Sequence, residues 1–307
     1  MEDRLGALGG QALRRTRRAW GRADGWLLLT PYLGGVVLLF LLPAVVSTAL
    51  IFARYDALAP PVWVGLENVN ALRRENLTGT AAGNSLYFLA LAVPFRLLGA
   101  LLLALLLQRR QPGVGFLRAV AYLPTVIPEA AYALIWLWAF NPLYGPVNAL
   151  LRGVGLPAPS WLADPGTAKL VFVFMSLFQI GEGFVVLLAA LQEIPTEYYD
   201  TAEVLGAGGT QMLSRITLPL VAPWFLLIAC RDIVLSFQYT FTTSYLMTGG
   251  DPYYATLFLP LLVYEEAFDR FRFGTGSALM AVVFVLSGTL VGILCVIHRH
   301  LSAEHER

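Results

Sequence analysis

Long apolar runs separated by short polar segments make up most of the chain. Six runs reach the roughly 20 mostly apolar residues that a helix needs to cross a bilayer, and lipid offers no partner to the backbone groups of an open, non-helical span. The runs are Trp26–Phe52, Ser85–Leu107, Ala119–Phe140, Ala168–Leu191, a segment that begins after Pro219 and ends at about Thr240, and Ser277–His298. The pattern predicts an all-α, polytopic membrane bundle with six transmembrane helices.

Two features of the pattern bear on where the spans end. Prolines 43, 94, 124 and 128 lie within the runs and are expected to kink a span or to mark its end, because neighbouring helices can satisfy the carbonyls that a proline frees. The apolar stretch Leu257–Tyr264 is too short to span a membrane, so we place it in an external loop.

The composition is also typical of a membrane protein. Of 307 residues, 57% are hydrophobic and 13% are charged, against about 25% charged residues in soluble domains. The net charge of +1 gives no reason to expect a nucleic-acid partner. Cys230 and Cys295 are too few for a disulfide framework and lack metal-ligand spacing. The first run is longer than a signal-peptide core and ends in no small-residue cleavage site, so we expect it to be retained.

Basic residues predict the orientation of the bundle. With the N-terminus inside, twelve Lys and Arg residues fall in cytoplasmic segments and seven in external ones, which agrees with the positive-inside rule. We therefore expect a cytoplasmic N-terminal tail over 1–25, a transmembrane domain over 26–298 with a cytoplasmic loop over 193–219, and a cytoplasmic C-terminal tail over 299–307.

The loop between the fourth and fifth spans is the longest cytoplasmic connection between spans. Its acidic residues Glu197, Asp200 and Glu203 recur every three positions and therefore share one side of a short helix. Glycines at 206, 208 and 209 then break that helix, since glycine permits the positive φ of a sharp turn. A second amphipathic segment, Met212–Leu218, leads back into the membrane at Pro219.

The spacing of this loop resembles the EAA motif of ABC-importer permeases: Glu-Ala-Ala, three residues, Gly, nine residues, Ile, one residue and Leu-Pro. Asp200-Thr201-Ala202 stands for the opening triplet, with Asp in place of Glu, and Leu205 replaces the Asp that usually precedes the glycine in the sugar-importer branch. The resemblance implies that the loop is a coupling helix lying in a cleft on a cytoplasmic ATPase subunit. The residues expected to carry that contact are Glu197, Asp200, Thr201, Ala202, Glu203, Gly206, Ile216, Leu218 and Pro219.

Looser motifs extend the resemblance over nearly the whole chain, to sugar-importer permeases of the maltose/glycerol-3-phosphate type. They are Trp63–Asn68, Phe116-Leu117-Arg118 with Leu123-Pro124, Trp136, Gly145 with Asn148, Leu246–Pro252, and Tyr264, Ala267, Phe268, Phe273 and Gly274. The resemblance implies a non-enzymatic subunit in a bacterial-type inner membrane. Its implied partners are a second permease, two cytoplasmic ATPases that bind ATP and Mg²⁺, and an external solute-binding protein. No cofactor or metal of its own is expected.

A glycine-rich segment follows the fifth span and is expected outside the cell. Gly249, Gly250, Asp251 and Pro252 are candidates for docking the binding protein. A plain surface turn is an equal alternative, because glycine and proline favour tight turns whether or not anything binds there.

Ionisable residues inside the spans are rare and are functional candidates by default. Glu182, between two glycines, is expected either to hydrogen-bond a sugar hydroxyl or to pair with Arg96 or Arg231. Arg231 and Asp232 are adjacent in one helix and are expected to point in different directions. Further cargo candidates, with simple packing as the alternative, are Gln238, Tyr239, Tyr245, Trp136 and, less centrally, Glu129.

Three other readings remain open. A phosphate-bearing cargo such as glycerol-3-phosphate is favoured by the external arginines Arg270 and Arg272. An ion-coupled secondary transporter would use Glu182 and the Arg231–Asp232 pair as a relay, although that class has more spans and paired broken helices. A membrane enzyme would rely on His298, His300 and His305, which are not accompanied by a catalytic pattern of acidic residues or cysteines. Dependence on an ATPase partner distinguishes the importer from the last two.

Overall fold

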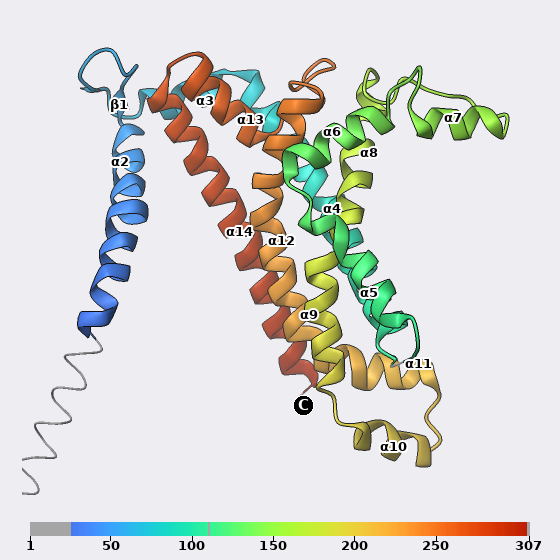
Figure 1. Ribbon diagram of the computed structural model, residues 1–307. Coiled ribbons are helices and arrows are strands. Elements are labelled where there is room, and N and C mark those ends of the chain that lie inside the picture. Colours follow the sequence, from blue (N-terminus) through green and yellow to red (C-terminus); the bar gives the residue numbers. More distant parts are fainter. Residues whose placement is uncertain (1–25, 110, 306–307) are drawn as a thin grey trace, which may run out of the picture.

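The computed structural model describes residues 26–109 and 111–305, and this part of the chain is almost entirely helical (Figure 1). Four helices are long and apolar enough to cross a membrane: Trp26–Leu50, Asn76–Leu107, Gly209–Met247 and Phe273–His300. Two bent pairs, Val114–Val126 with Glu129–Ala139 and Pro165–Gln179 with Gly181–Gln192, bring the number to six if each pair is one span. The predicted all-α membrane bundle is confirmed.

The elements follow one another as short and long helices with one small sheet. Strands β1 (Ala53–Arg54) and β2 (Val62–Trp63) pair antiparallel. The α-helices are α2 (Leu42–Leu50), α3 (Glu67–Arg74), α4 (Asn76–Leu107), α5 (Val114–Tyr122), α6 (Glu129–Ala139), α7 (Pro146–Gly153), α8 (Pro165–Ser176), α9 (Gly181–Gln192), α10 (Thr196–Val204), α11 (Gly209–Met212), α12 (Leu218–Met247), α13 (Leu259–Tyr264) and α14 (Phe273–His305). Single 3-10 or π turns are η1 (Val37–Leu41), η2 (Leu123–Val126), η3 (Leu177–Gln179), η4 (Leu213–Thr217) and η5 (Glu265–Asp269).

The short elements gather at the two ends of the bundle. The sheet, α3, α7 and α13 lie at one end, while α10, α11 and the C-terminal end of α14 lie at the other (Figure 1). The described start of the first helix lies at the same end as α10. An even number of spans connects these two termini, as the sequence predicts.

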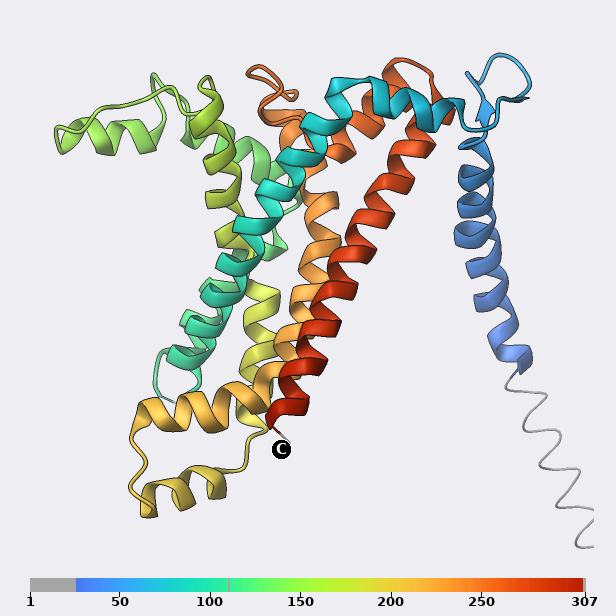
Figure 2. The ribbon, with the colours of Figure 1, turned by 180° about the vertical axis from the view of Figure 1, so that it is seen from behind.

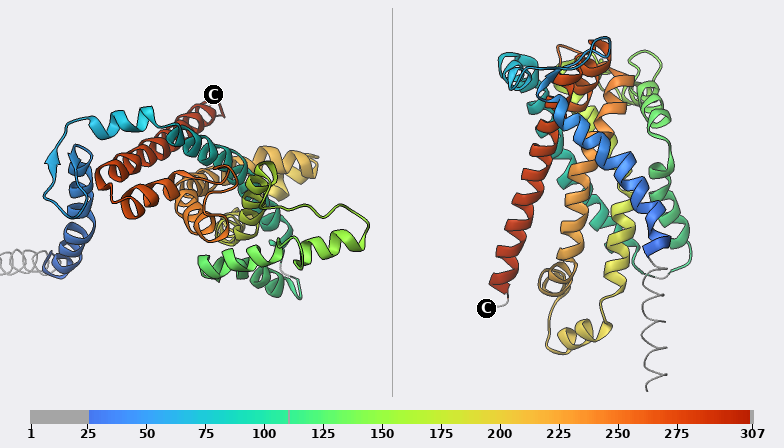
Figure 3. Two further views of the ribbon diagram at one scale, coloured as in Figure 1. Left: turned by 90° about the horizontal axis from the view of Figure 1, so that it is seen from above. Right: turned by 90° about the vertical axis from the view of Figure 1, so that its left-hand side faces the viewer.

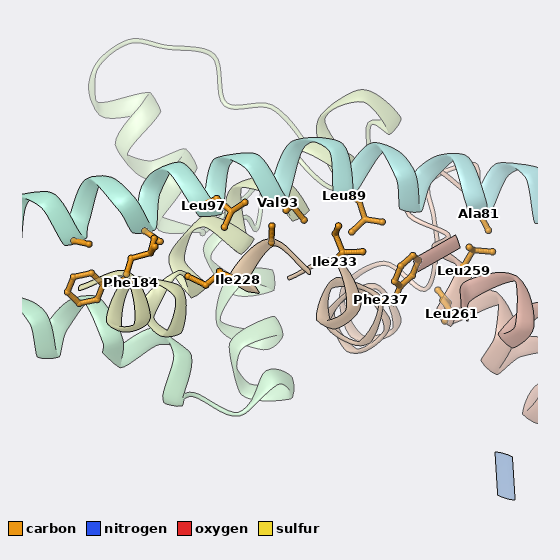
Figure 4. Close-up of a cluster of buried hydrophobic side chains, with 14 of the residues drawn as sticks. Ala81, Leu89, Val93, Leu97, Phe184, Ile228, Ile233, Phe237, Leu259 and Leu261 are labelled. Atoms are coloured by element: carbon orange, nitrogen blue, oxygen red, sulfur yellow. The ribbon is translucent and has the colours of Figure 1, made fainter. Parts of the chain in front are cut away.

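Helix α4 is the centre of the core. Its residues Leu89, Val93 and Leu97 are buried in one hydrophobic cluster with Ile233 of α12 and Phe184 of α9 (Figure 4). Leu259 and Leu261 of α13 extend the same cluster toward the end that carries the sheet. One long helix therefore connects the packing of both halves of the chain.

The stretch Leu257–Tyr264 lies in the connection between the fifth and sixth spans, as expected, but it is mostly a buried helix rather than an open loop. Most of it forms helix α13, and Leu257, Leu259 and Leu261 are each at most 1% exposed. Polar side chains of α4 hold the segment: Asn84 donates to the carbonyl oxygens of Tyr254 (2.8 Å) and Leu257 (2.9 Å), and Ser85 Oγ accepts the N–H of Leu259 at 2.9 Å. The apolar run is too short to span a membrane, and it is instead buried against the bundle.

The third and fourth spans are broken. Pro124 and Pro128 predict a kink or an end in the third span, whereas the fourth apolar run predicts a continuous helix. The third bends by 99° between η2 and α6, and the fourth by 43° between η3 and α9. At the first break Ile127 is extended, with ψ 128°, because the following Pro128 disfavours the helical conformation at the residue before it. The expected range Ala119–Phe140 therefore covers two helices that differ in direction.

The fifth span begins earlier and ends later than expected. One helical run extends from Gly209 to Met247, so Pro219 does not mark its start. The π turn η4 lies directly before this proline and shifts the hydrogen-bond ladder where the proline lacks an N–H. The first part of this run lies across the end of the bundle before α12 turns along it (Figure 2).

The first helix, Trp26–Leu50, stands apart from the rest of the bundle (Figure 3). None of its residues is buried, although its composition is strongly apolar. It approaches the remaining helices through contacts of α2 with α14 and β1. Such a surface suits lipid or another apolar helix rather than water.

We predict that Gly274→Ala destabilises the end that carries the sheet. A Cβ at this position would collide with the carbonyl oxygen of Ala53 and lie 2.6 Å from Asn68 Nδ2, which itself donates to Ala53 O and Ile51 O at 2.9 Å. Overpacking of this kind costs about 1–3 kcal/mol. Thermal unfolding of the purified protein in detergent measures the effect.

The control is Gly288→Ala in the same helix, where nothing lies within 4 Å of the added carbon. This change should leave the unfolding temperature unchanged or slightly raise it, since Ala favours helix over Gly. Equal unfolding temperatures for the two variants would contradict the packing described for Gly274.

Candidate functional site

A polar cavity of about 160 Å³ lies between α4, α12 and the breaks of the third and fourth spans. It is lined by Arg96, Thr125, Ile127, Glu129, Gln179, Glu182, Arg231, Asp232, Leu235, Gln238 and Tyr239. Five of these side chains are ionisable acids or arginines, although the helices around them are apolar. Such a cluster inside a membrane bundle is expected to serve a function, because charge is costly at that depth.

Four of the five charged side chains of the cavity form one chain of ion pairs across three helices. Arg96 of α4, 6% exposed, places Nε 3.3 Å from Asp232 Oδ2 and donates to Ser236 Oγ at 2.6 Å. Asp232 Oδ1 lies 3.1 Å from Arg231 Nη1, and Arg231 in turn pairs with Glu182 of α9. Arg231 and Asp232 therefore meet, contrary to our expectation, because the long arginine side chain curls back to its neighbour.

Two glycines let α9 approach its neighbours beside the cavity. A Cβ on Gly181 would lie 2.8 Å from Thr125 Cγ2 and 2.9 Å from the Cα of Tyr122, so only glycine fits against the break of the third span. Gly183 lies on the other side of Glu182, where a Cβ would be 3.3 Å from Ile228 of α12. The close approach that small residues allow in membrane bundles therefore positions Glu182.

Among the polar groups of the cavity that no ion pair engages, Glu129 and Tyr239 stand out. Glu129 begins α6 directly after the break and accepts a hydrogen bond from Thr242 Oγ1 at 2.9 Å. The hydroxyl of Tyr239 is buried and has no hydrogen-bond partner among residues 26–109 and 111–305. A buried polar atom of this kind calls for an explanation, and a bound molecule is one.

The structure brings together four of the six cargo candidates identified in the sequence. Glu129, Glu182, Gln238 and Tyr239 line the cavity. Trp136 instead packs among aromatic rings, with ring centroids 5.0 Å from Phe178 and 5.4 Å from Phe140. Tyr245 likewise packs on other aromatic rings, those of Phe241 and Tyr264.

Sequence reasoning missed the cavity residues that the helix breaks supply. Thr125, Ile127 and Gln179 are ordinary residues of apolar runs by sequence and line the cavity only because both spans bend there. The signal was present in Pro124 and Pro128, since irregular backbone inside a membrane protein is tolerated where it is buried or lines a cavity.

The segment that is expected to contact an ATPase, 197–219, projects from the end of the molecule opposite the sheet. Glu197, Asp200, Thr201, Ala202 and Glu203 lie on α10, and none of its residues is buried. Ile216 lies in η4, whereas Leu218 and Pro219 begin α12. One hydrogen bond between Tyr199 and Thr217 side chains, 2.9 Å long, ties α10 to the start of the fifth span.

Gly206 ends α10 in a Schellman cap. Its φ is +81°, the Ala207 N–H reaches the Ala202 carbonyl at 2.9 Å, and its own N–H reaches the Glu203 carbonyl at 2.9 Å. This left-handed conformation favours glycine. Beside the cap, Val204 and Leu205 are 88% and 81% exposed, so the tip of the projection is apolar.

The glycine-rich segment at the other end is a well-held turn. Gly249 and Gly250 have φ of +59° and +91°, and the buried Thr256 hydroxyl donates to the Asp251 carbonyl at 2.7 Å. Gly250 is buried, while Gly249 and Asp251 are exposed, as is the neighbouring Tyr253. Only part of the predicted docking set is therefore accessible.

Ion pairs close to this turn hold the same end together. Glu266 is fully buried and pairs with Arg270, and its Oε2 lies 3.6 Å from Arg272 Nη1. Burial raises the pKa of the neighbouring Glu265 above its usual value, while the nearby Arg270 acts in the opposite direction. Arg270 and Arg272, which were expected outside and favoured a phosphate-bearing cargo, thus have carboxylate partners.

We predict that Asp232→Asn destabilises the protein much more than Glu182→Gln. The first change leaves the buried Arg96 without its counter-charge, which costs about 3–5 kcal/mol. The Glu182–Arg231 pair has side chains 47% and 40% exposed, and such pairs contribute about 0–1 kcal/mol. Thermal unfolding of both variants in detergent tests the ranking, and a larger loss for Glu182→Gln would contradict it.

Comparison with known proteins gives a consistent picture. A family model described as "Binding-protein-dependent transport system inner membrane component" matches residues 82–300. "Probable ABC transporter permease protein YesP" of Bacillus subtilis is 31% identical over 93% of this chain and 94% of its own. The trehalose/maltose transport system permease protein MalF of Thermococcus litoralis is 32% identical, and the match covers 85% of this chain and 89% of that protein. The sn-glycerol-3-phosphate transport system permease protein UgpA of Brucella abortus is 31% identical, with 85% and 91% covered.

Among solved structures, a bacterial ABC transporter involved in the import of the acidic polysaccharide alginate has a chain with the same fold. The TM-score is 0.79 at 22% identity, and the match covers 92% of this chain and 99% of the other. At that identity the similarity concerns the fold.

Proposed function

The chain belongs to the family of binding-protein-dependent transport system inner membrane components, and from this premise we propose that it carries a carbohydrate across the membrane as one of two permease subunits. The cargo is delivered by an external solute-binding protein. Two cytoplasmic ATPase subunits bind ATP and Mg²⁺ and drive the change between inward-facing and outward-facing states. This chain itself catalyses no reaction in the proposal.

The observation that carries the proposal is the projection of α10 from the bundle. Helix α10 is short, has no buried residue, is acidic along one side and is apolar at its tip. Nothing in the described part of the chain stabilises such a helix by burying its apolar tip. It is connected to the membrane by η4 and the start of α12, so force on α10 reaches a spanning helix directly. These properties fit a helix that seats on a mobile ATPase subunit.

The proposed orientation places α10 in the cytoplasm. The described beginning of the first helix and the C-terminal end of α14 lie at the same end of the bundle as α10 (Figure 1). Both termini are then cytoplasmic, in agreement with the excess of basic residues on that side. The N-terminal tail, residues 1–25, lies outside the described residues.

The opposite end is proposed to receive the binding protein. The turn Gly249–Pro252 lies there, and exposes Asp251 beside the 86% exposed ring of Tyr253. Gly250 and Pro252 determine the shape of the turn. They contribute little contact surface for a binding protein, since Gly250 is buried. An aromatic ring next to a carboxylate suits a polar protein surface, because aromatic residues contribute much of the energy at such contacts.

A carbohydrate fits the cavity better than the alternatives do. Carboxylates, amides and a free phenol hydroxyl are groups that bind sugar hydroxyls, and they line one space among the helices. The relative from Thermococcus litoralis is named for trehalose and maltose, which agrees with that chemistry. Glycerol-3-phosphate, named for other relatives, is the second candidate.

We predict that Asp200→Arg weakens the interaction with the ATPase. The change reverses a charge on the exposed acidic side of α10, so a complementary basic site on the partner would repel it. With both permeases, the ATPases and the binding protein in proteoliposomes, ATP hydrolysis stimulated by the binding protein should fall at least fivefold. Co-purification of the ATPase through a tag on this chain should fall as well.

The matched control is Asp269→Arg, an exposed acid at the opposite end of the bundle, for which ATPase co-purification should stay unchanged. Failure of the unmodified chain to recover any ATPase subunit would overturn the importer proposal, whatever the variants do.

We also predict that the Gly206 cap is needed for coupling. Gly206→Ala places a side chain on a residue with a φ of +81°, which costs about 1 kcal/mol. The control is Gly208→Ala, because Gly208 has a φ of −78° and an added Cβ would have no neighbour within 4 Å. The first variant should lower stimulated ATP hydrolysis several-fold at unchanged thermal stability of the bundle. The second should match the unmodified protein, and equal loss in both would contradict a role for the cap.

A further inference from the structure

We propose that the polar cavity selects an uncharged, hydroxyl-rich cargo and excludes anionic cargo such as uronic acids and sugar phosphates. The inference rests on the proposed function and narrows the cargo class of this chain's part of the pathway. It follows from two features of the cavity: the pairing of its charged side chains, and the polar groups that have no ion-pair partner and can bind a ligand.

The two arginines of the cavity are already occupied. Arg96 is held by Asp232 and by the hydroxyl of Ser236, and its Nη2 also donates to the Asp232 carbonyl at 3.3 Å. Arg231 is held between Glu182 and Asp232. An incoming phosphate or carboxylate at the buried Arg96 would have to displace Asp232, which leaves a buried charge uncompensated. At the part-exposed Arg231 it would have to displace Glu182, whose carboxylate would stay close by and repel the new anion.

The cavity also carries a surplus of negative charge. Its two arginines stand against three carboxylates, those of Glu129, Glu182 and Asp232, so the formal sum is −1. Glu129 is the source of the surplus, since no ion pair engages it among the described residues and its recorded side-chain partner is the neutral hydroxyl of Thr242. A second anion close to Glu129 is repelled, and weak solvent screening at a part-buried site strengthens that repulsion.

The groups left for a ligand suit hydroxyls. Glu129 can accept hydrogen bonds, and the unpartnered hydroxyl of Tyr239 can donate or accept one. Gln179 and Gln238 add amides, which also do both. A sugar ring with several hydroxyls can serve all four at once, because each hydroxyl is both a donor and an acceptor.

On this inference the cargo of this chain differs from that of two similar proteins with acidic cargo in their names. One is named for sn-glycerol-3-phosphate, and the other belongs to a transporter of the acidic polysaccharide alginate. The shared fold therefore need not imply shared cargo, since selection here depends on Glu129 and the pairing of two arginines.

Direct binding to the complete transporter tests the inference. The complex of both permeases and the ATPases is placed in lipid nanodiscs without nucleotide, and titrated with maltotriose as the neutral probe and trigalacturonate as the anionic probe. The unmodified complex should bind maltotriose at least tenfold more tightly, which is the order expected for one unpaired charge at a part-buried site.

Variants at two cavity positions separate charge from shape. Glu129→Lys should reduce the preference for maltotriose to about threefold or less, and Glu129→Gln should give an intermediate ratio. Tyr239→Phe should weaken maltotriose several-fold and leave the ratio between probes unchanged. Asp269→Lys, far from the cavity at the outer end, should change neither quantity.

Three results would overturn the inference. They are equal affinity of the unmodified complex for the two probes, an unchanged ratio in Glu129→Lys, and no binding of maltotriose by a complex that recovers its ATPases. None of them affects the importer assignment, which fails separately if no ATPase subunit is recovered with this chain.

Discussion

The structure depends on a constraint that the bilayer sets: a helix broken inside the membrane must hide the backbone groups that the break frees. The two breaks, at Ile127–Pro128 and around Ile180, lie against each other, and the second also lies against α4. Gly181 makes that contact possible, because any larger residue would collide with the third span. Once the breaks are turned inward, Thr125, Glu129 and Gln179 share one space, and a polar cavity results.

The cavity and the projecting helix α10 are connected by one continuous helical run, Gly209–Met247. Thr217, which bonds to Tyr199 of α10, precedes Arg231 by about 20 Å of helix at 1.5 Å per residue. Arg231 and Asp232 then tie this helix to α9 and α4. A displacement of α10 can therefore reach the ion-pair chain through a rigid element, with no flexible linker between Gly209 and the cavity.

Hydrophobic runs predicted where the membrane spans lie, but not how they bend or where they end. Apolar side chains indicate that a segment contacts lipid or the protein core. The position of a break depends instead on local backbone preferences, as at Pro128, and on which neighbouring helix packs against the break. The burial of Leu257–Tyr264 was missed for the same reason: a short apolar run gives no indication of Asn84, 170 or more residues earlier, that holds it. Chemical type alone likewise could not tell Tyr239, which faces the cavity, from Tyr245, which stacks on other rings.

The charge balance of the cavity can be understood from the cost of charge in a membrane protein. Arg96 is tolerated because Asp232 and Ser236 meet it, and Arg231 because two carboxylates do. By this reasoning two carboxylates would suffice for two arginines, and Glu129 adds a third at a cost in stability. A neutral glutamine could accept the Thr242 hydroxyl equally well, so folding gives no reason for the charge. The charge of Glu129 is explained if the cavity needs a strong hydrogen-bond acceptor that also repels anions. In that case the cargo is selected at Glu129, the first residue of α6.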